Sequence, residues 1–320
     1  MADGPTFKKI AVIGAGLIGS SFARAARVAG IVGELIGWDR DAAVLAEAMT
    51  LGVFDRAAAD LDTAIAHADL VMIAVPVGAY RSLGPGLAAK LHTGAIVTDV
   101  GSVKEDVIDA LAPFMPEGTH FVPGHPVAGT ERSGPAAGFA ELFQNRWCIL
   151  TPPDGTDGHA VETVAAMWRA LGCDVEIMDA HHHDRVLAIT SHLPHLISYT
   201  IVATAADLED QLRNNEGDDD RVTTTEVIKF SAGGFRDFTR IAGSDPVMWR
   251  DVFLANKDAV LDMLGRSSED LTALQRAIRW GDSDTLESLF SRTREIRRGV
   301  VEAGQAGRFV PTENGDKEPE

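Results

Sequence analysis

The sequence predicts a doubly wound α/β domain followed by an all-α domain. Over the first 179 residues, short continuous apolar runs alternate with helix-like stretches. Such runs are typical of parallel strands that are covered on both faces by helices. From residue 181 to about residue 301 we find only long helical patterns and no convincing strand. We therefore expect domains at 1–179 and 180–303, followed by a flexible tail at 304–320.

The strands of the first domain are expected at its apolar runs. Four of these runs lie at 8–14, 34–38, 70–76 and 95–100. Two later runs, at 146–152 and 174–179, flank a helix-like stretch, and we expect them to extend the same sheet. In the second domain, Ser244-Asp245-Pro246 predicts one helix start and Ser267-Ser268 predicts another. An acidic loop is expected between helices at 209–220.

Composition excludes several classes of protein. The 320 residues include 29 Lys plus Arg and 47 Asp plus Glu, which gives a formal net charge of −18. A general nucleic-acid binder needs clustered basic residues, so that class is not expected. The two cysteines, Cys148 and Cys173, form no disulfide or zinc pattern and are expected to be small buried residues. The amino terminus lacks the apolar core of a signal peptide, so we expect a cytoplasmic protein.

One stretch, 186–206, contains no Asp, Glu, Lys or Arg and is long enough to span a bilayer. It also contains His192, Pro194 and His195, which are costly inside a membrane. A buried helix of the helical domain is the better interpretation, and no membrane association is expected.

A glycine fingerprint follows the first predicted strand. Gly14, Gly16 and Gly19 form G-x-G-x-x-G at the start of a helix, with Leu17 and Ile18 between them. This context is typical of a dinucleotide site, in which the pyrophosphate lies at the helix N-terminus. Asp39 ends the second strand, where a carboxylate would bind the ribose hydroxyls and repel a 2′-phosphate. NAD is therefore expected, although the neighbouring Arg40 would suit NADP.

Three further segments carry residue types suited to chemistry. His125, in the stretch 124–134, is expected in a loop at the carboxyl end of a strand, where a histidine can accept a proton or simply bond backbone. His192 and His195 share a helix face and could line a polar pocket, bind metal or lie bonded in the core. Without Cys or carboxylates at ligand spacing, we expect no metal.

Arg236 and Arg240 lie four residues apart after two glycines. Arginine suits bidentate carboxylate binding, but a surface salt bridge with Asp237 would be ordinary. Ser102 and Glu105 have the spacing of a capping box, in which the serine could still reach a ligand. The run His181–Asp184 resembles a metal cluster, but consecutive helical side chains diverge, so it is expected to be the solvated start of the second domain.

Five of these motifs together resemble the prephenate and arogenate (cyclohexadienyl) dehydrogenases of tyrosine biosynthesis. They are GAGLIGSS, DVGSVK, HPVAGTERSG, SHLPH and GGFRDFTRIAGSDPVMWRD, and the resemblance covers about residues 7–300. It implies a Rossmann-like NAD domain and a helical domain through which two chains form a homodimer. It implies neither a fused regulatory domain nor a chorismate mutase segment.

The resemblance also implies roles for individual residues. His125 matches the histidine that takes the proton of the ring hydroxyl, and Ser102 matches a serine beside the nicotinamide. In the substrate pocket, His195 is supported by His192, and Arg240 binds a substrate carboxylate. The remaining matches are Glu131 and Asp237 at the pocket mouth and Trp249 on the dimer side of the pocket.

The implied reaction is oxidative decarboxylation of prephenate to 4-hydroxyphenylpyruvate, of arogenate to tyrosine, or of both. Two other functions stay open on the sequence alone. A β-hydroxyacid or imine reductase shares the two-domain plan and would use a lysine base, for which Lys229 and Lys257 are available. A non-enzymatic NAD-sensing dimer would need no base.

Overall fold

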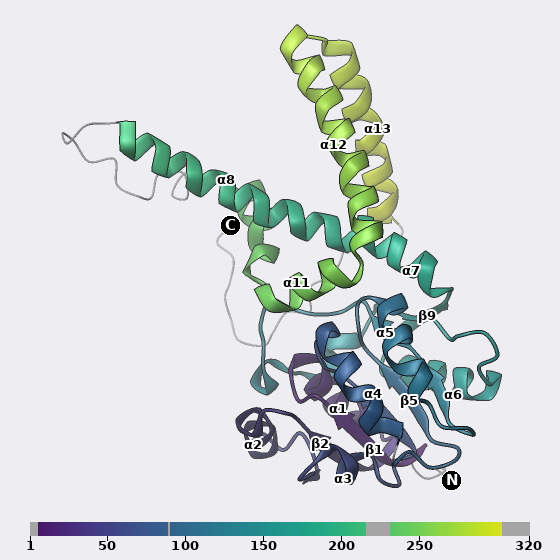
Figure 1. Ribbon diagram of the computed structural model, residues 1–320. Coiled ribbons are helices and arrows are strands. Elements are labelled where there is room, and N and C mark those ends of the chain that lie inside the picture. Colours follow the sequence, from purple (N-terminus) through teal and green to yellow (C-terminus); the bar gives the residue numbers. More distant parts are fainter. Residues whose placement is uncertain (1–5, 89, 216–230, 303–320) are drawn as a thin grey trace. The chain divides into compact units, whose positions relative to one another are not determined.

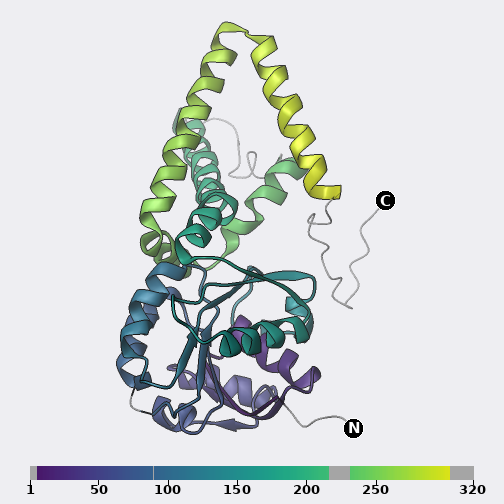
Figure 2. The same cartoon turned by 90° about the vertical axis from the view of Figure 1, so that its right-hand side faces the viewer.

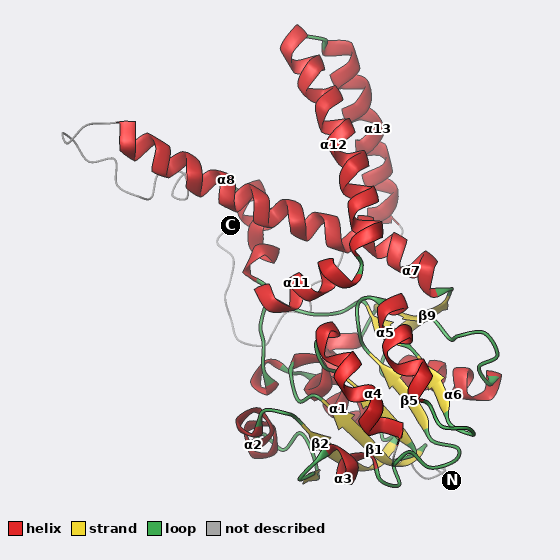
Figure 3. Ribbon diagram, in the orientation of Figure 1, coloured by secondary structure: helices red, strands yellow, loops and turns green. Residues whose placement is uncertain are grey.

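The protein is described by a computed structural model that covers residues 6–88, 90–215 and 231–302 (Figure 1). The chain divides into two compact units, with the boundary after Val260. The first unit holds every described strand, as Figure 3 shows, together with the helices up to α11. The second unit holds most of α12 and all of α13.

Six parallel strands form the main sheet of the described chain, in the order β3-β2-β1-β4-β5-β6. They are β1 (Phe7–Ile13), β2 (Val32–Trp38), β3 (Arg56–Ala57), β4 (Leu70–Ile73), β5 (Ile96–Asp99) and β6 (His120–Val122). The chain starts in the middle of the sheet at β1, moves outward to β3, and then crosses to β4 on the other side of β1. The predicted doubly wound fold is confirmed, with its switch point between β1 and β4.

Helices cover both faces of this sheet. Successive side chains of β1 alternate between two apolar cores: Ile10 and Val12 in one, Ala11 and Ile13 in the other. The first core includes α1 (Leu17–Val28) and α6 (Gly158–Ala170), and the second includes α4 (Tyr80–Ala88) and α5 (Lys104–Leu111). Of the two remaining helices, α2 (Ala42–Thr50) packs in the first core and α3 (Leu61–Ile65) packs in the second. Because both faces are buried, the strands consist of continuous apolar runs.

The runs at 146–152 and 174–179 do not extend the main sheet, which corrects the prediction. They contribute β8 (Arg146–Leu150) and β9 (Cys173–Ile177) to a second sheet with β7 (Gly124–Pro126), in the order β7-β8-β9. Pro123 separates β6 from β7. It has no N–H to donate, and its carbonyl accepts the N–H of Thr151 at 2.9 Å, so pairing passes to β8.

Among the described residues after 179, every regular element is a helix. Its elements are α7 (Ala180–Leu187), the π-helical segment η5 (Ala188–His192), α8 (Leu193–Asn215), α10 (Gly233–Thr239), the 3₁₀ turn η6 (Arg240–Gly243), α11 (Pro246–Ala255), α12 (Lys257–Trp280) and α13 (Ser283–Glu302). Asp245 caps α11, as predicted, by accepting the N–H of Met248. The helix start predicted at Ser267 is wrong, because α12 runs through it.

The uncharged stretch lies within the continuous helical run Ala180–Leu208, which is long and apolar enough to cross a membrane by length and composition alone. Its early part is packed, with His192 and Ser198 fully buried. Farther along α8, Ile201 and Leu208 are 37% and 48% exposed, so the expected buried helix is only partly buried in the single chain. The acidic loop predicted at 209–220 is wrong for 209–215, which belong to α8; 216–220 and the tail 304–320 lie outside the described residues.

The second unit consists mainly of two long helices that meet at a turn. Gly281 takes φ +67° in this turn, a conformation that favours glycine, and Figure 2 shows the helices diverging from it. Both carry exposed apolar side chains, among them Leu271 (60%), Ile278 (67%), Phe290 (57%) and Ile296 (61%).

Candidate functional site

The glycine-rich turn joins β1 to α1. Gly14 has φ +101°, and a Cβ added there would lie 2.3 Å from the carbonyl oxygen of Ala74. A Cβ added at Gly19 would lie 2.0 Å from the carbonyl oxygen of Gly14, so α1 can pack against the turn only with glycine there. A Cβ at Gly16 would meet no atom within 4 Å. Gly16 therefore leaves open space that a pyrophosphate can approach.

The residues around this open space fit a dinucleotide. The N–H groups of Leu17 and Ile18, in the first turn of α1, have no carbonyl partner within the helix. Asp39 lies beside the turn, where one carboxylate oxygen accepts the N–H of Ala15 at 2.8 Å and the other accepts the N–H of Asp41 at 2.8 Å. Each oxygen keeps a lone pair for a ribose hydroxyl.

Gly16→Val is expected to weaken NAD⁺ binding at least about 10-fold while leaving the fold intact, because a Cβ at this position meets no protein atom within 4 Å and the side chain enters the open space that the pyrophosphate would approach. Gly19→Val is the matched contrast and is expected to lower the melting temperature, because its side chain strikes the backbone of Gly14. Titration with NAD⁺ and thermal melting separate the two effects. Unchanged NAD⁺ affinity in Gly16→Val would remove this turn from the cofactor site.

His125 lies in the short strand β7, directly after β6, and not in a loop as predicted. Its ladder partner is Ile149 of β8, and its side chain is only 8% exposed. The Nδ1 atom of His125 lies 2.8 Å from Nε2 of His183, and the two rings meet edge to face with centroids 5.0 Å apart. The imidazole is therefore held from one side by a residue of α7.

His183 and Asp184 are both buried, which corrects the expectation that the run 181–184 is a solvated segment. Nδ1 of His183 lies 2.7 Å from a carboxylate oxygen of Asp184. The same carboxylate accepts the N–H groups of Lys104 and Glu105, at 2.8 and 2.9 Å, at the start of α5. This packing of α7 against α5 buries one face of α7, while His181 and His182 stay exposed.

Burial is the main reason that the pKa of His125 lies well below its ordinary value. Nearby His183, Lys104 and His192 lower this pKa further, because a positive charge on any of them disfavours another on His125. Burial likewise lowers the pKa of His183, although Asp184 opposes the shift. His125 is therefore neutral at physiological pH, as a proton acceptor must be.

A buried ion pair contacts the backbone of Gly124, the residue before His125. The Nζ atom of Lys104 lies 2.6 Å from Oδ2 of Asp99 and donates to the carbonyl oxygen of Gly124, also at 2.6 Å. Oδ1 of Asp99 accepts the N–H of Gly124 at 3.0 Å, and Oδ2 also accepts the hydroxyl of Tyr80 at 3.1 Å. Both side chains of the pair are fully buried. The backbone next to His125 is thus fixed by a lysine from α5 and an aspartate from β5.

The capping box predicted at Ser102 is wrong. Helix α5 starts after Val103, and no side chain within this segment caps it. The carboxylate of Asp184 takes the place of a local cap, so a residue 80 positions away satisfies the first N–H groups of the helix. Ser102 is half-buried between β5 and α5, and its hydroxyl has no structural role in the cap.

The predicted histidines of the helical region lie against Trp249 of α11. His195 stacks on the indole ring, with centroids 3.6 Å apart and an interplanar angle of 24°, and His192 meets it edge-on at 6.0 Å. Nδ1 of His195 donates to the carbonyl of Ser191 at 2.9 Å, so Nε2 is its free lone pair when the ring is neutral. The structure therefore brings together three residues that the sequence places in the substrate pocket.

His192 is fixed from its other side by Asn256. The amide of Asn256 donates to Nδ1 of His192 at 3.1 Å and to the carbonyl of Asp184 at 2.8 Å. Burial lowers the pKa of His192 to about 4, helped by His183 and His195 against the opposing effect of Asp184. Neutral His192 thus connects His195 and Trp249, through Asn256, to Asp184 and its neighbours His183 and His125.

Arg240 is positioned by η6 and forms an ion pair with Glu131, from the loop after β7, at 3.0 Å. Both side chains are roughly half exposed, at 47% and 40%. Arg240 also lowers the pKa of His195, behind the larger effect of burial, which places its charge near that ring. Asp237 is exposed on α10 and joins none of these contacts.

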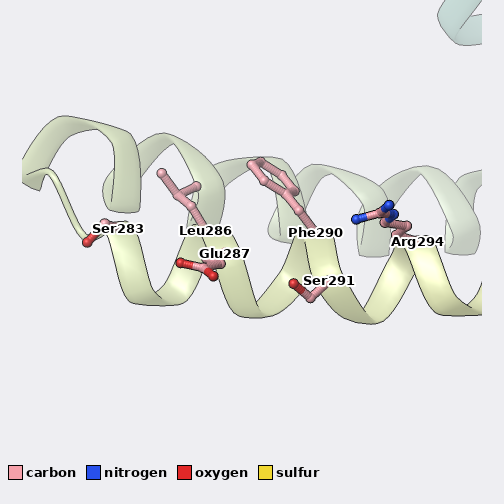
Figure 4. A pocket seen from close by; sticks show the side chains of 6 residues that line it. All are labelled: Ser283, Leu286, Glu287, Phe290, Ser291 and Arg294. Atoms are coloured by element: carbon pink, nitrogen blue, oxygen red, sulfur yellow. The ribbon is translucent and has the colours of Figure 1, made fainter.

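Other proposed features lie apart from this site. The described residues contain no group of three His, Cys, Asp or Glu that could hold a metal ion. Lys257 is exposed at the start of α12, and Lys229 lies outside the described residues. An open hollow of about 420 Å³ lies along one face of α13 and contains no predicted site residue (Figure 4). Cys148 and Cys173 are buried free thiols, as predicted.

Sequence reasoning missed four residues that contact the site histidines or the backbone beside them. They are Lys104, His183, Asp184 and Asn256. For His183 a signal existed, because it shares a helical face with the buried Leu187 four residues later. Lys104 stands in the DVGSVK motif but has no local partner that would mark it as buried. The sequence gives no signal for Asn256.

The comparisons with known proteins agree with this geometry. The family model for the prephenate dehydrogenase nucleotide-binding domain matches residues 22–177, and the model for the prephenate dehydrogenase dimerization domain matches residues 179–292. Together these matches cover most of the chain.

Curated and solved relatives point the same way. The chain is 40% identical over 291 residues to a cyclohexadienyl dehydrogenase of Zymomonas mobilis, covering 91% of this chain and 95% of that protein. It is 35% identical over 295 residues to a prephenate dehydrogenase of Bacillus subtilis, covering 91% and 76%. A crystal structure of prephenate dehydrogenase from Aquifex aeolicus, in complex with hydroxyphenyl propionate and NAD⁺, superposes with a TM-score of 0.79 at 32% identity and covers 92% of this chain and 98% of that one. The chain belongs to the prephenate dehydrogenase family.

Proposed function

We propose that this protein catalyses the NAD-dependent oxidative decarboxylation of prephenate to 4-hydroxyphenylpyruvate, of arogenate to tyrosine, or of both, in tyrosine biosynthesis. The observation that carries the proposal is a neutral, buried histidine, His125, in a chain that also has a glycine turn suited to NAD. The names of its relatives, cyclohexadienyl and prephenate dehydrogenase, support the same reaction.

Each site residue has a role in this proposal. Bound NAD⁺, held by the glycine turn and Asp39, supplies the hydride acceptor. His125 accepts the proton of the ring hydroxyl as the carbonyl forms, and loss of the ring carboxylate as CO₂ then gives a phenol. The proton returns to the same oxygen, so His125 holds it only transiently. Ser102 orients the hydroxyl beside the nicotinamide.

The remaining residues bind the substrate. Arg240 binds a substrate carboxylate, which takes the place of the Glu131 carboxylate in the ion pair. Arginine suits this role because it binds carboxylates bidentately. His195, stacked on Trp249 and supported by His192, offers its free Nε2 to the pocket. Glu131 and Asp237 form the acidic mouth of the pocket.

The test is NADH formation by the purified protein with prephenate and with arogenate, each with NAD⁺ and with NADP⁺. Turnover of either substrate with NAD⁺ supports the reaction class, and the ratio of the two kcat/KM values identifies the preferred substrate. Absence of turnover with both substrates and both cofactors would reject the proposal.

The helical region is proposed to form a homodimer in the cytoplasm. We propose domains at 1–179 and 180–303. The dimerization-domain match covers 179–292, so all of it but residue 179 lies in the second domain. A second copy would cover the exposed apolar residues of α12 and α13, such as Phe290 and Ile278. Light scattering after size-exclusion chromatography would give twice the 34.1 kDa chain mass.

The pH profile of kcat should show an acid limb below the ordinary histidine value of about 6.5. His125 acts only when neutral, and its pKa is lowered, mainly by burial, so protonation should inactivate the enzyme only at more acidic pH. The profile is measured with saturating substrate and NAD⁺. A limb at or above about 6.5 would mean that a different group carries the proton.

Arg240→Gln is expected to raise KM for the substrate about 10- to 100-fold with a smaller effect on kcat, because a charge-assisted hydrogen bond contributes roughly 1.5–3 kcal/mol. Arg236→Gln, one helical turn earlier and also exposed, is the matched control and should leave KM unchanged. If the two variants exchange these phenotypes, Arg236 is the carboxylate ligand.

A further inference from the structure

We infer that His183 is a positioning residue that fixes the tautomer of His125, so that Nε2 of His125 is the proton-accepting atom. The inference deepens the proposed function and rests on it for its kinetic test. It starts from a chain of contacts between three buried side chains. Asp184 lies 2.7 Å from Nδ1 of His183, and Nε2 of His183 lies 2.8 Å from Nδ1 of His125.

The proton positions follow from the partners of Asp184. Its carboxylate accepts two backbone N–H groups at the start of α5, so it is a pure acceptor and has no proton to offer His183. Nδ1 of His183 must therefore carry a proton. A neutral imidazole has only one, which leaves Nε2 of His183 as an acceptor.

The position of the proton on His125 is fixed in a similar way. A short contact of 2.8 Å between two ring nitrogens needs one proton between them, because two lone pairs would repel. Since Nε2 of His183 accepts, Nδ1 of His125 must donate. The lone pair of neutral His125 is then on Nε2, the ring atom opposite to His183. Burial keeps both rings neutral by lowering the pKa of each.

This arrangement also suits the moment when His125 holds the proton. The imidazolium keeps its Nδ1–H bond to His183, and the carboxylate of Asp184 contacts the other nitrogen of the His183 ring. Because the proton returns to the oxygen it left, no path to solvent is needed. His183 is fully buried, so solvent does not compete for its contact with His125.

His183 can be tested without removing the cap of α5, which depends on Asp184. In His183→Gln, the side-chain carbonyl can take the place of Nε2 and accept from His125. In His183→Leu, no acceptor remains and His125 can adopt the wrong tautomer, which in serine proteases costs about 10⁴-fold in kcat. We expect kcat to fall about 10²- to 10⁴-fold in His183→Leu and at least about 10-fold less in His183→Gln.

KM for the substrate and the affinity for NAD⁺ should stay near the wild-type values in both variants. His182→Leu, next to His183 on the exposed side of α7, is the control and should keep the wild-type kcat. Equal kcat in His183→Leu and wild type, or in His183→Leu and His183→Gln, would overturn the inference while leaving the proposed function intact.

A spectroscopic measurement tests the tautomer without any activity. In protein labelled with ¹⁵N only at histidine, the signals of His125 are assigned by their loss in His125→Asn. The wild-type spectrum should show protonated Nδ1 and bare Nε2, and the opposite pattern would overturn the inference even if His183→Leu fails to fold. Lack of turnover by the wild type would instead reject the proposed function and leave this spectrum as the decisive result.

Discussion

Replacing His125 with asparagine should remove most of the kcat and leave NAD⁺ affinity unchanged. We expect kcat to fall about 10²- to 10⁴-fold, the usual contribution of a positioned general base. Asparagine is polar and smaller than histidine, so it can stay in β7, but it cannot accept and hold a proton. The glycine turn and Asp39 belong to other elements, so the cofactor site keeps its own hydrogen bonds.

Steady-state kinetics and an NAD⁺ titration of the same preparation test this expectation. His120→Asn is a suitable control, because His120 lies at the start of β6, is less buried and is five residues before His125. It should keep the wild-type kcat. A His125→Asn variant that retains its kcat would show that His125 is not the proton acceptor.

Much of the α/β fold is predictable because its signal is local. The strands of the main sheet are buried on both faces, so each one appears as a continuous apolar run. The second sheet is not predictable in this way. Strand β8 ends in an apolar run like those of the main sheet, and it is set apart by the missing N–H of Pro123 and the long-range pairing of His125 with Ile149. Strand β9 alternates polar and apolar residues and is partly exposed, and it pairs with β8.

The site was predictable where a residue acts through its type and motif. The glycine turn, His125, His195 with Trp249, and Arg240 with Glu131 all lie where the sequence places functional groups, and their individual roles stay predictions. The supporting residues were not predictable, because their partners are far away in the chain. Asp184 caps a helix 80 residues earlier, and Ser102, which has the local capping pattern, does not cap it.

The run 181–184 shows how a correct physical statement can support a wrong conclusion. The side chains of a helix do point in different directions around its axis, but that does not keep the whole run in solvent. His183 and Asp184 both face inward and lie 2.7 Å apart, and His183 also contacts His125. His181 and His182 are exposed. The apolar positions that follow at helical spacing were the better guide to burial.

The second large effect is expected for Lys104→Met. Methionine fills much of the volume of lysine but leaves the carboxylate of Asp99 fully buried without its ion-pair partner. Breaking a buried pair from one side costs about 3–5 kcal/mol. The hydroxyl of Tyr80 and the N–H groups of Gly101 and Gly124 still donate to Asp99, so we expect a loss near the lower end of that range.

Denaturant unfolding of wild type, Lys104→Met, Asp99→Asn and the double variant measures this loss and the coupling of the two residues. The double variant should be more stable than Lys104→Met, because a neutral amide does not need the cation. The kcat of Lys104→Met should also fall, because the carbonyl of Gly124, next to His125, loses its donor. A Lys104→Met protein within about 1 kcal/mol of wild type would mean that the carboxylate of Asp99 becomes protonated or hydrated without its lysine.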